Sequence, residues 1–414
     1  MPAKPSVLVA ALTGCATVLP QAFAANAEFQ NFFFDVCQSP TGQLAARCGE
    51  TPAGLGNLSG DSESSLNPSQ NIGHSRPALS SAQSRSKAVR EKGEKLRDGG
   101  PLSNGDDTTA VAGPLSVLVN IHASWFERDS KDNASERNFD GDSRALEIGL
   151  DYRRSDRLVM GALVGYEKSD YAFAAEAPGV NFVPAASAGS ADGKQRYLTV
   201  FGTWRISDRF YMELSAGSER GDSDFARNPV FQESTRSLPQ FDVRVAGSAS
   251  IRTNWASINA GFDQQRGAVS FGPYAGVTLS RTRIGSYEET DLNGSGLNMA
   301  FDASSRNSLL AHAGMRIGYS ASSRLGVVLP QLRLEYQQEL KADAGRATAR
   351  FVQDGAATNY SFNGQQGDRN ALNAGLSVAC ILPGGWMPFI DYSILVGSED
   401  FDRQRATLGL RVEF

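Results

Sequence analysis

The last ten residues of the chain, Arg405-Ala-Thr-Leu-Gly-Leu-Arg-Val-Glu-Phe414, decide the fold. Apolar side chains occupy every second position from Ala406 to Phe414, and charged or small residues lie between them. Successive side chains of a strand point to opposite faces, so this pattern predicts a β-strand with one apolar and one polar face. Because the strands of a soluble sandwich alternate in the same way, the segment alone leaves both architectures open.

The same alternation recurs along the chain from about residue 112 onward. Ile148 and Leu150, for example, alternate with Glu147 and Asp151. Alternation over several residues is the main sequence signal of a half-buried strand. We expect twelve strands, at roughly 115–127, 142–154, 157–171, 194–206, 209–221, 248–263, 268–284, 305–320, 324–340, 369–382, 385–397 and 402–414.

The lengths of the connections separate the two architectures. Brief connections are expected at 155–156, 207–208, 264–267, 321–323 and 383–384, and long polar ones at 128–141, 172–193, 222–247, 285–304 and 341–368. Only the last hairpin, near Glu399 and Asp400, breaks this alternation by being short. Short turns on one side and long loops on the other are typical of outer-membrane barrels. The sequence therefore predicts an all-β fold, a twelve-stranded antiparallel transmembrane barrel over residues 112–414 in a bacterial outer membrane.

The two faces of the predicted strands suit such a barrel. A barrel in lipid presents an apolar outer band, and its interior can hold charged groups. Alternation predicts that these polar side chains point into the lumen: Glu147, Asp151, Glu213, Arg316, Asp391, Arg411 and Glu413. Aromatic residues near the segment ends are expected to form girdles at the membrane interfaces: Trp125, Phe126, Tyr152, Tyr166, Tyr319, Tyr336 and Phe414.

Residues 1–24 are expected to be an export signal. Lys4 supplies a short positive region, residues 6–19 are apolar, and Ala22-Phe23-Ala24 is typical of a signal-peptidase site. A rival interpretation uses Leu12-Thr13-Gly14-Cys15, which resembles a lipoprotein signal with Cys15 as the lipidated residue. Both interpretations export the chain across the inner membrane.

Residues 25–77 are expected to be a short exported polar segment. Like the linker that follows, they are rich in Ser, Asn, Asp, Gly, Pro and charge, and should form little packed core. Cys37 and Cys48 are close in sequence, and an oxidising compartment favours a disulfide between them. The segment lacks a CxxC motif and its nearest histidine is His74, so a metal site is not expected.

Residues 78–111 are expected to be a helix, at 78–97, followed by a linker. Good helix formers dominate, and Gly99-Gly100-Pro101 supplies a stop. About twenty helical residues span roughly 30 Å, enough to cross the hydrocarbon layer. With almost no apolar face, a helix this basic suits a lumen lined by acids. Its cations are Arg85, Lys87, Arg90, Lys92, Lys95 and Arg97, and the expected acids are Glu147, Asp151, Glu213, Asp391 and Glu413. A disordered linker outside the pore remains the alternative.

The composition excludes several classes of function. A net charge of −5 gives no basic surface for a nucleic-acid partner. Beyond the N-terminus the chain lacks an apolar run of 18 charge-free residues, which excludes a multi-helix membrane protein. Besides His74 the only histidines are His122 and His312, and both are expected to be polar lumen residues rather than catalytic groups. We therefore expect no enzymatic activity and no cofactor.

Four stretches resemble autotransporter β-domains: residues 267–287, which begin GAVSFGPY, residues 329–336 (LPQLRLEY), residues 385–392 (GWMPFIDY) and residues 405–414. The resemblance covers about residues 112–414. It implies a twelve-stranded barrel with a helix threaded through the pore, which translocates an N-terminal passenger to the cell surface. A terminal strand such as the one ending at Phe414 also resembles the signal read by the β-barrel assembly machinery of the outer membrane.

The resemblance also implies an orientation and a set of partners. The N-terminal segment would face the cell surface and the C-terminus the periplasm. The partners would be outer-membrane lipid, the assembly machinery and the chain's own N-terminal segment in the lumen. Residues 25–111, about 87 in number, are too few for a β-helical passenger, so a displayed segment would be short. A passive pore or a surface-loop adhesin without a secretion role is the alternative, and an empty lumen would conduct where a plugged one would not.

Overall fold

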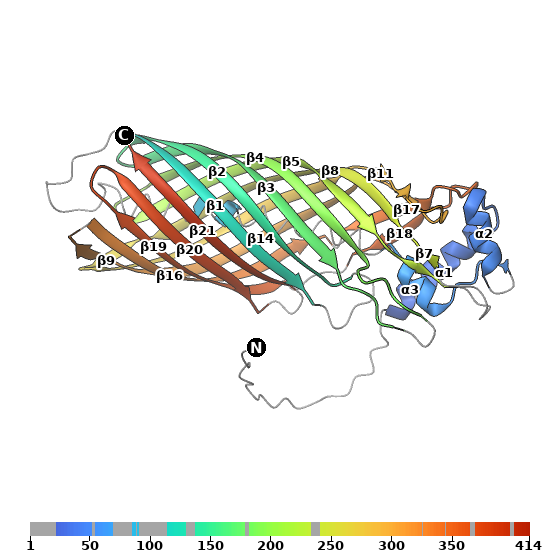
Figure 1. Cartoon of the computed structure of the whole chain (residues 1–414). Coiled ribbons are helices and arrows are strands. Elements are labelled where there is room, and N and C mark those ends of the chain that lie inside the picture. The colour runs from blue at the N-terminus through green and yellow to red at the C-terminus, as the bar shows by residue number, and fades with distance from the viewer. Residues whose placement is uncertain are drawn as a thin grey trace, which may run out of the picture.

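Long antiparallel strands form a closed barrel of twelve (Figure 1). The computed structural model describes residues 22–51, 54–68, 85–87, 89–90, 114–129, 137–178, 182–232, 241–324, 326–343, 345–364, 369–397 and 401–414. The barrel strands are β1 (Leu115–Arg128), β2 (Phe139–Ser155), β3 (Leu158–Phe173), β4 (Gly189–Arg205), β5 (Phe210–Arg227), β8 (Val245–Phe262), β10 (Val269–Ile284), β14 (Ser304–Tyr319), β16 (Gly326–Ala342), β19 (Asn370–Ile381), β20 (Trp386–Val396) and β21 (Asp402–Glu413). Each pairs with the next, and β21 returns to β1, where Ile121 lies opposite Leu408. The predicted fold is confirmed.

The two ends of the barrel differ in their connections. The end that holds the C-terminus has tight turns such as 156–157 and 206–209 (Figure 1). Two further turns at this end lie next to the small strands β9 (Gln264–Arg266) and β15 (Ala321–Ser323). We refer to it as the short-turn end. The opposite end, the long-loop end, carries the connections 129–138, 174–188, 228–244, 285–303 and 343–369.

The long connections contain regular structure where the sequence predicted polar loops. β11 (Tyr287–Glu288), β13 (Met299–Phe301), β17 (Arg346–Phe351) and β18 (Tyr360–Asn363) form a four-stranded sheet. A second pair joins β6 (Val230–Phe231) and β7 (Phe241–Asp242), and β12 (Thr290–Asp291) extends the barrel sheet at β8. Their apolar residues are too few per strand to give a strong alternation signal, and they are buried by contacts with distant segments.

Several barrel strands extend further toward the long-loop end than the sequence predicted. β4 begins at Gly189 rather than at 194, and β5 ends at Arg227 rather than at 221. The outward side chains of these extensions include Ser190, Asp192 and Asp224, so the segments resemble loops in composition. They lie beyond the apolar band, where a polar outer face is compatible with strand pairing.

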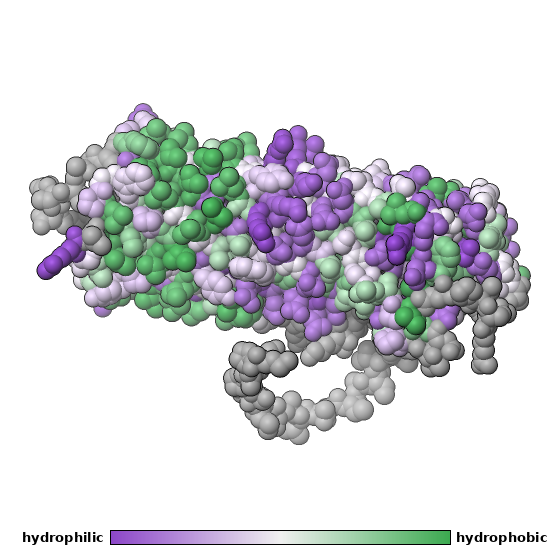
Figure 2. All heavy atoms as spheres, viewed as in Figure 1, coloured by the Kyte–Doolittle hydropathy of each residue, from purple (hydrophilic) through white to green (hydrophobic). Residues whose placement is uncertain are grey.

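The outer surface carries an apolar band near the short-turn end. Figure 2 shows this band over about half of the barrel, followed by a hydrophilic belt toward the long-loop end. Six of the expected girdle aromatics are exposed: Trp125, Tyr152, Tyr166, Tyr319, Tyr336 and Phe414. The seventh, Phe126, is only 8% exposed and packs inside with Phe139 and Tyr171, so its assignment to a girdle was wrong. Its neighbour Trp125 points outward, and alternation therefore turns Phe126 inward.

The N-terminal residues form three helices that pack on the long loops. They are α1 (Ala22–Val36), α2 (Gly42–Glu50) and α3 (Gly60–Leu66), and we refer to them with β6, β7, β11, β13, β17 and β18 as the cap domain (Figure 1). The side chains of Phe29 and Phe33 are fully buried, and the Phe32 ring stacks on Phe351 at 5.6 Å between centroids. In the described part of the chain, no helix is both long and apolar enough to cross a membrane.

For the described residues up to Leu66, the expectation of little packed core was therefore wrong. The Phe29, Phe32, Phe33 and Val36 side chains recur at helical spacing and share one buried face with loop residues. The polar residues around this short apolar stripe outnumber it, so the composition of the whole segment does not indicate a core. Cys37 and Cys48 are joined by a disulfide, with Cα atoms 5.5 Å apart, which links the end of α1 to α2. The expected signal peptide lies mostly outside the described residues, and α1 already begins at Ala22.

Candidate functional site: the lumen of the barrel

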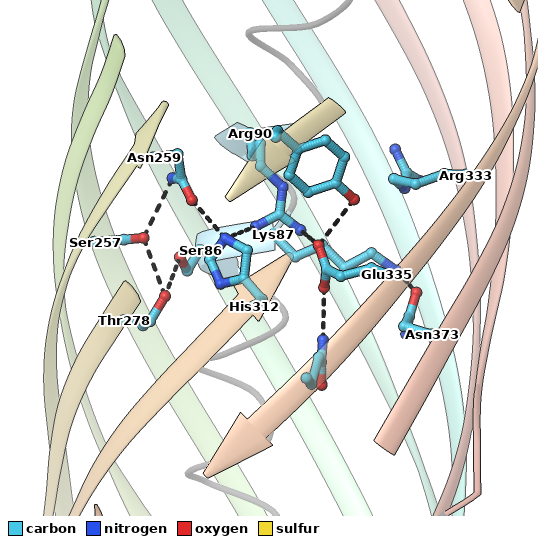
Figure 3. Close-up of polar contacts among 12 residues, drawn as sticks. Ser86, Lys87, Arg90, Ser257, Asn259, Thr278, His312, Arg333, Glu335 and Asn373 are labelled. Atoms are coloured by element: carbon cyan, nitrogen blue, oxygen red, sulfur yellow. Dashed lines mark hydrogen bonds and ion pairs between the residues drawn. The ribbon is translucent and has the colours of Figure 1, made fainter. Parts of the chain in front are cut away.

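A short helical segment lies inside the barrel. Residues 85–87 and 89–90 are helical and buried within the lumen (Figure 3), and the rest of the predicted helix 78–97 lies outside the described residues. The contacts of these five residues reach seven barrel strands: β3, β4, β5, β10, β14, β16 and β19. The segment therefore bridges the lumen from wall to wall.

Arg90 has the densest set of partners. Its guanidinium forms a hydrogen bond with His312 at 2.8 Å, pairs with Glu335, and lies over the Tyr274 ring at 4.9 Å from the centroid. Tyr274 donates to Glu335 at 2.9 Å, and Gln337 donates to its other oxygen at 2.7 Å (Figure 3). Both oxygens of this buried carboxylate are thus satisfied, as a buried charge requires.

Arg85 reaches the opposite side of the lumen. It donates to Glu167 of β3 at 2.6 Å, pairs with Glu219 of β5, and lies over the Tyr197 ring of β4 at 3.7 Å. The Tyr197 ring itself lies on Gly165, where any Cβ would collide with it. The glycine gives the ring room to lie flat against the wall, and the ring then supports the guanidinium through a cation–π contact.

The remaining helical residues add polar and apolar contacts. Ser86 shares a hydrogen bond with Thr278 at 3.1 Å, and Lys87 donates to Asn373 (Figure 3). Val89 packs in a buried cluster with Phe201 and Trp255. Although the sequence gives this helix almost no apolar face, its Val89 meets aromatic side chains that point into the lumen.

The structure buries six of the lumen residues predicted from the sequence, namely Glu147, Asp151, Glu213, Arg316, Asp391 and Arg411, and half-buries the seventh, Glu413. It brings three of them together, since Arg411 pairs with Asp151 at 3.2 Å and also with Glu413. Asp391 pairs with Arg333 at 3.1 Å, Arg316 pairs with Asp263, and Glu147 accepts from Asn120 at 2.8 Å. Arg411–Asp151 and Asp391–Arg333 each reach across one intervening strand, β1 and β19, whereas Asn120 and Glu147 lie on the adjacent strands β1 and β2. The pairs thus tie the barrel wall together.

The acids that pair with the described helical residues are different ones. Glu167, Glu219 and Glu335 were not singled out from the sequence, although all three occupy inward positions of their strands. Alternation places Glu167 between the outward Tyr166 and Lys168, so the signal was present. The depth of the helix in the pore decides which inward acids it meets, and the sequence does not encode that depth locally.

A second anchor joins the cap domain to the barrel. Arg227, at the end of β5, forms two hydrogen bonds with Glu289, at 2.9 and 2.7 Å, and donates to the carbonyls of Leu66 and Leu297. Such a bidentate arginine–carboxylate pair is geometrically specific. The cap is therefore attached through fixed polar contacts as well as through its apolar core. Within the cap, partial burial on α3 raises the pKa of the Glu63 carboxyl.

The described segments lie in order along the barrel axis. Pro114 is at the short-turn end, where its carbonyl accepts from Arg153 at 2.7 Å. Residues 85–90 lie in the lumen, and α1–α3 lie at the long-loop end (Figure 1). The described residues hold no group of acidic, histidine or cysteine side chains that could bind a metal ion. The described segments thus lie at both ends of the lumen and within it, and paired charges hold residues 85–90 against the wall.

Comparison with known proteins identifies this architecture. The family model described as autotransporter beta-domain matches residues 117–393, more than half of the chain. The chain belongs to the autotransporter β-domain family. Sequence comparison with curated proteins gives no match.

A solved structure agrees with this autotransporter β-domain in fold. The translocator domain of the autotransporter NalP from Neisseria meningitidis superposes with a TM-score of 0.55 at 14% identity, covering 81% of this chain and 98% of that one. The β-domain of the Bordetella autotransporter BrkA gives a TM-score of 0.47 at 17% identity, covering 73% of this chain and 100% of that one. At these identities the likeness to NalP concerns the barrel fold alone. The family places the barrel in the outer membrane.

Proposed function

We propose that the barrel exports residues 25–77 of its own chain through the lumen and displays them at the cell surface in the cap domain. The proposal rests on one observation, the order of the described segments from Pro114 at the short-turn end, through residues 85–90, to α1–α3 at the long-loop end. A completed export would leave the chain in this order, with the helical segment as a plug.

The orientation is part of the proposal. Outer-membrane barrels generally have short periplasmic turns and longer extracellular loops. The C-terminus lies at the short-turn end, and the cap domain shares its core with the long loops (Figure 1). We therefore place the cap outside the cell and Phe414 in the periplasm, with outer-membrane lipid around the apolar band.

A passive pore is less well supported. Arg85 and Arg90 are each buried and paired with wall carboxylates, so the plug is not a loose chain that happens to lie in the channel. Removing a buried charge from its partner is costly, which favours a pore that stays closed. We assign no catalytic role to the lumen.

Surface labelling tests the proposal. An epitope inserted between Gly54 and Leu55, an exposed part of the cap, should bind antibody on intact cells. A matched epitope between Ser207 and Asp208, in an exposed tight turn at the other end, should bind only after the outer membrane is permeabilised. The reverse result would overturn the orientation, and a cap epitope hidden in intact cells despite a correctly assembled barrel would overturn the display.

A further inference from the structure

Four arginines stand side by side on the outer wall of the barrel. Arg196 of β4 lies directly opposite Arg220 of β5, which lies opposite Arg252 of β8, which in turn lies opposite Arg283 of β10. All four side chains are exposed. With neighbouring strands about 4.8 Å apart, this arginine row extends roughly 14 Å around the barrel.

The row is at the edge of the apolar band. On β4 the next outward residue toward the short-turn end is Leu198, which lies opposite Val164 of β3. Figure 2 shows the hydrophilic belt that adjoins the band here. Cations at this level lie beside the headgroups of a surrounding membrane rather than in its hydrocarbon.

The row has no internal compensation. None of the four arginines forms an ion pair with a residue in the described part of the chain. The nearby Lys168, by contrast, pairs with Asp170 at 2.9 Å, and Lys194 lies opposite Asp222. Like charges directly opposite each other destabilise a sheet, so a fourfold repetition calls for an anion from outside.

The arginines also line a hollow of the surface together with apolar side chains. The same hollow is bordered by Leu146, Ile148, Val164 and Leu198, and also by Asp222, which lies opposite Lys194. A guanidinium binds phosphate in a bidentate manner, and an apolar floor suits an acyl chain. The two features together fit a lipid that carries phosphate on its headgroup.

We propose that the arginine row binds a phosphorylated glycolipid, lipid A, in the outer leaflet of the membrane. The phosphates contact the guanidinium groups, and an acyl chain lies along the apolar side chains beneath them. This binding rests on the proposed orientation, which puts the row in the outer leaflet, but it does not depend on passage of the N-terminal segment. The row would hold a lipid at one side of the barrel, over β4, β5, β8 and β10.

The test compares two full-length variants that each lose four exposed arginines. The first is Arg196→Gln/Arg220→Gln/Arg252→Gln/Arg283→Gln. The matched control, Arg154→Gln/Arg209→Gln/Arg266→Gln/Arg324→Gln, removes exposed charges near the short-turn end. Lipopolysaccharide that copurifies with each barrel is measured by phosphate and fatty-acid analysis, and binding is measured in phosphatidylcholine vesicles with and without lipopolysaccharide. Heat resistance on gels verifies that both variants are folded.

The row variant should retain roughly tenfold less lipopolysaccharide than the wild type, since each cation near an anionic lipid surface adds to the attraction, and the control should retain the wild-type amount. Binding to the wild type should weaken as NaCl is raised. Equal retention by the row variant, or equal loss in the control, would overturn the proposal. If inorganic phosphate at the concentration of the lipid displaces the lipid, the row is a phosphate site and the glycolipid assignment is overturned. Preference for anionic phospholipid would also overturn that assignment.

Discussion

Arg90 is a side chain through which the lumen segment contacts the barrel wall. Arg90 and Glu335 are both almost fully buried and form an ion pair. His312 forms a hydrogen bond with Arg90, and Tyr274 donates one to Glu335. Removing one member of a buried pair leaves an uncompensated charge, whereas replacing both with apolar residues of similar size can be nearly neutral. The contribution of the pair to docking of the lumen segment can therefore be measured with single and double variants.

We expect Arg90→Met to weaken docking of the lumen segment by roughly 3–5 kcal/mol, because Glu335 would stay buried without its cation. Arg90→Met/Glu335→Leu should recover much of that loss. Protease sensitivity of the lumen segment and thermal unfolding of the purified barrel measure both effects. If the two single-variant losses simply add in the double variant, the two residues do not act as a pair.

For Phe414 we propose a role in assembly rather than in packing. Its side chain is 63% exposed on the outer face, and its backbone N–H donates to the Leu115 carbonyl at 2.9 Å, next to the seam between β21 and β1. We expect deletion of Phe414, and also Phe414→Ala, to leave the protein in the periplasm, while Phe414→Tyr assembles normally. Cell fractionation measures the outcome, and normal outer-membrane levels of both the deletion and the Ala variant would contradict it.

At the level of elements, the lumen segment joins two groups of strands, β3–β5 and β10–β19, that lie on different sides of the barrel and do not pair with each other. Its side chains reach Glu167 and Glu219 on one side of the lumen and Asn373 and Glu335 on the other. Reversing its charge would place acids against these acids in a space where the charges are screened poorly.

We expect Arg85→Glu/Lys87→Glu/Arg90→Glu to expel the segment and raise single-channel conductance in planar bilayers. The control Arg154→Glu/Arg209→Glu/Arg266→Glu reverses three exposed charges outside the lumen and should leave conductance low. Should the lumen variant conduct no more than the control, the segment does not close the pore.

The elements differ in how well the sequence predicted them. The twelve barrel strands followed from alternation because each has one face in lipid or water and one face in the lumen. The ends near the long loops were missed, as at Gly189 and Arg227, since beyond the membrane both faces of a strand can be polar. The helical segment was predicted from charge and length, but the identity of its partners depends on its depth and rotation in the pore.

At the scale of the whole molecule, the cap domain joins the N-terminal helices to loops that lie far along the sequence. α1 contributes Phe32, which stacks on Phe351, and Thr41 donates its backbone N–H to the Gln353 carbonyl at 2.8 Å. This domain could not be predicted from composition, because its core is assembled from short apolar runs that are far apart in the sequence, such as those around Phe32, Leu297 and Phe351. Long-range assembly leaves little local signal.

We expect Cys37→Ser/Cys48→Ser to destabilise the cap by roughly 2–3 kcal/mol, because a short loop loses its closure. Limited proteolysis of intact cells should then cut the cap faster while the barrel keeps its heat resistance. Cys380→Ser is the control, since Cys380 is a free cysteine in a barrel strand. Unchanged cleavage of the double variant would show that packing alone holds α1 to α2.

The strands that continue past the apolar band separate the cap domain from the membrane surface. On β4 the residues from Gly189 to Tyr197 lie beyond the last outward leucine, Leu198. At about 3.3 Å per residue and a tilt near 40°, they raise the rim roughly 20 Å clear of the hydrocarbon. The cap stands beyond that rim. A macromolecule that meets the cap can therefore approach it from the side as well as from above, without displacing the lipid around the base.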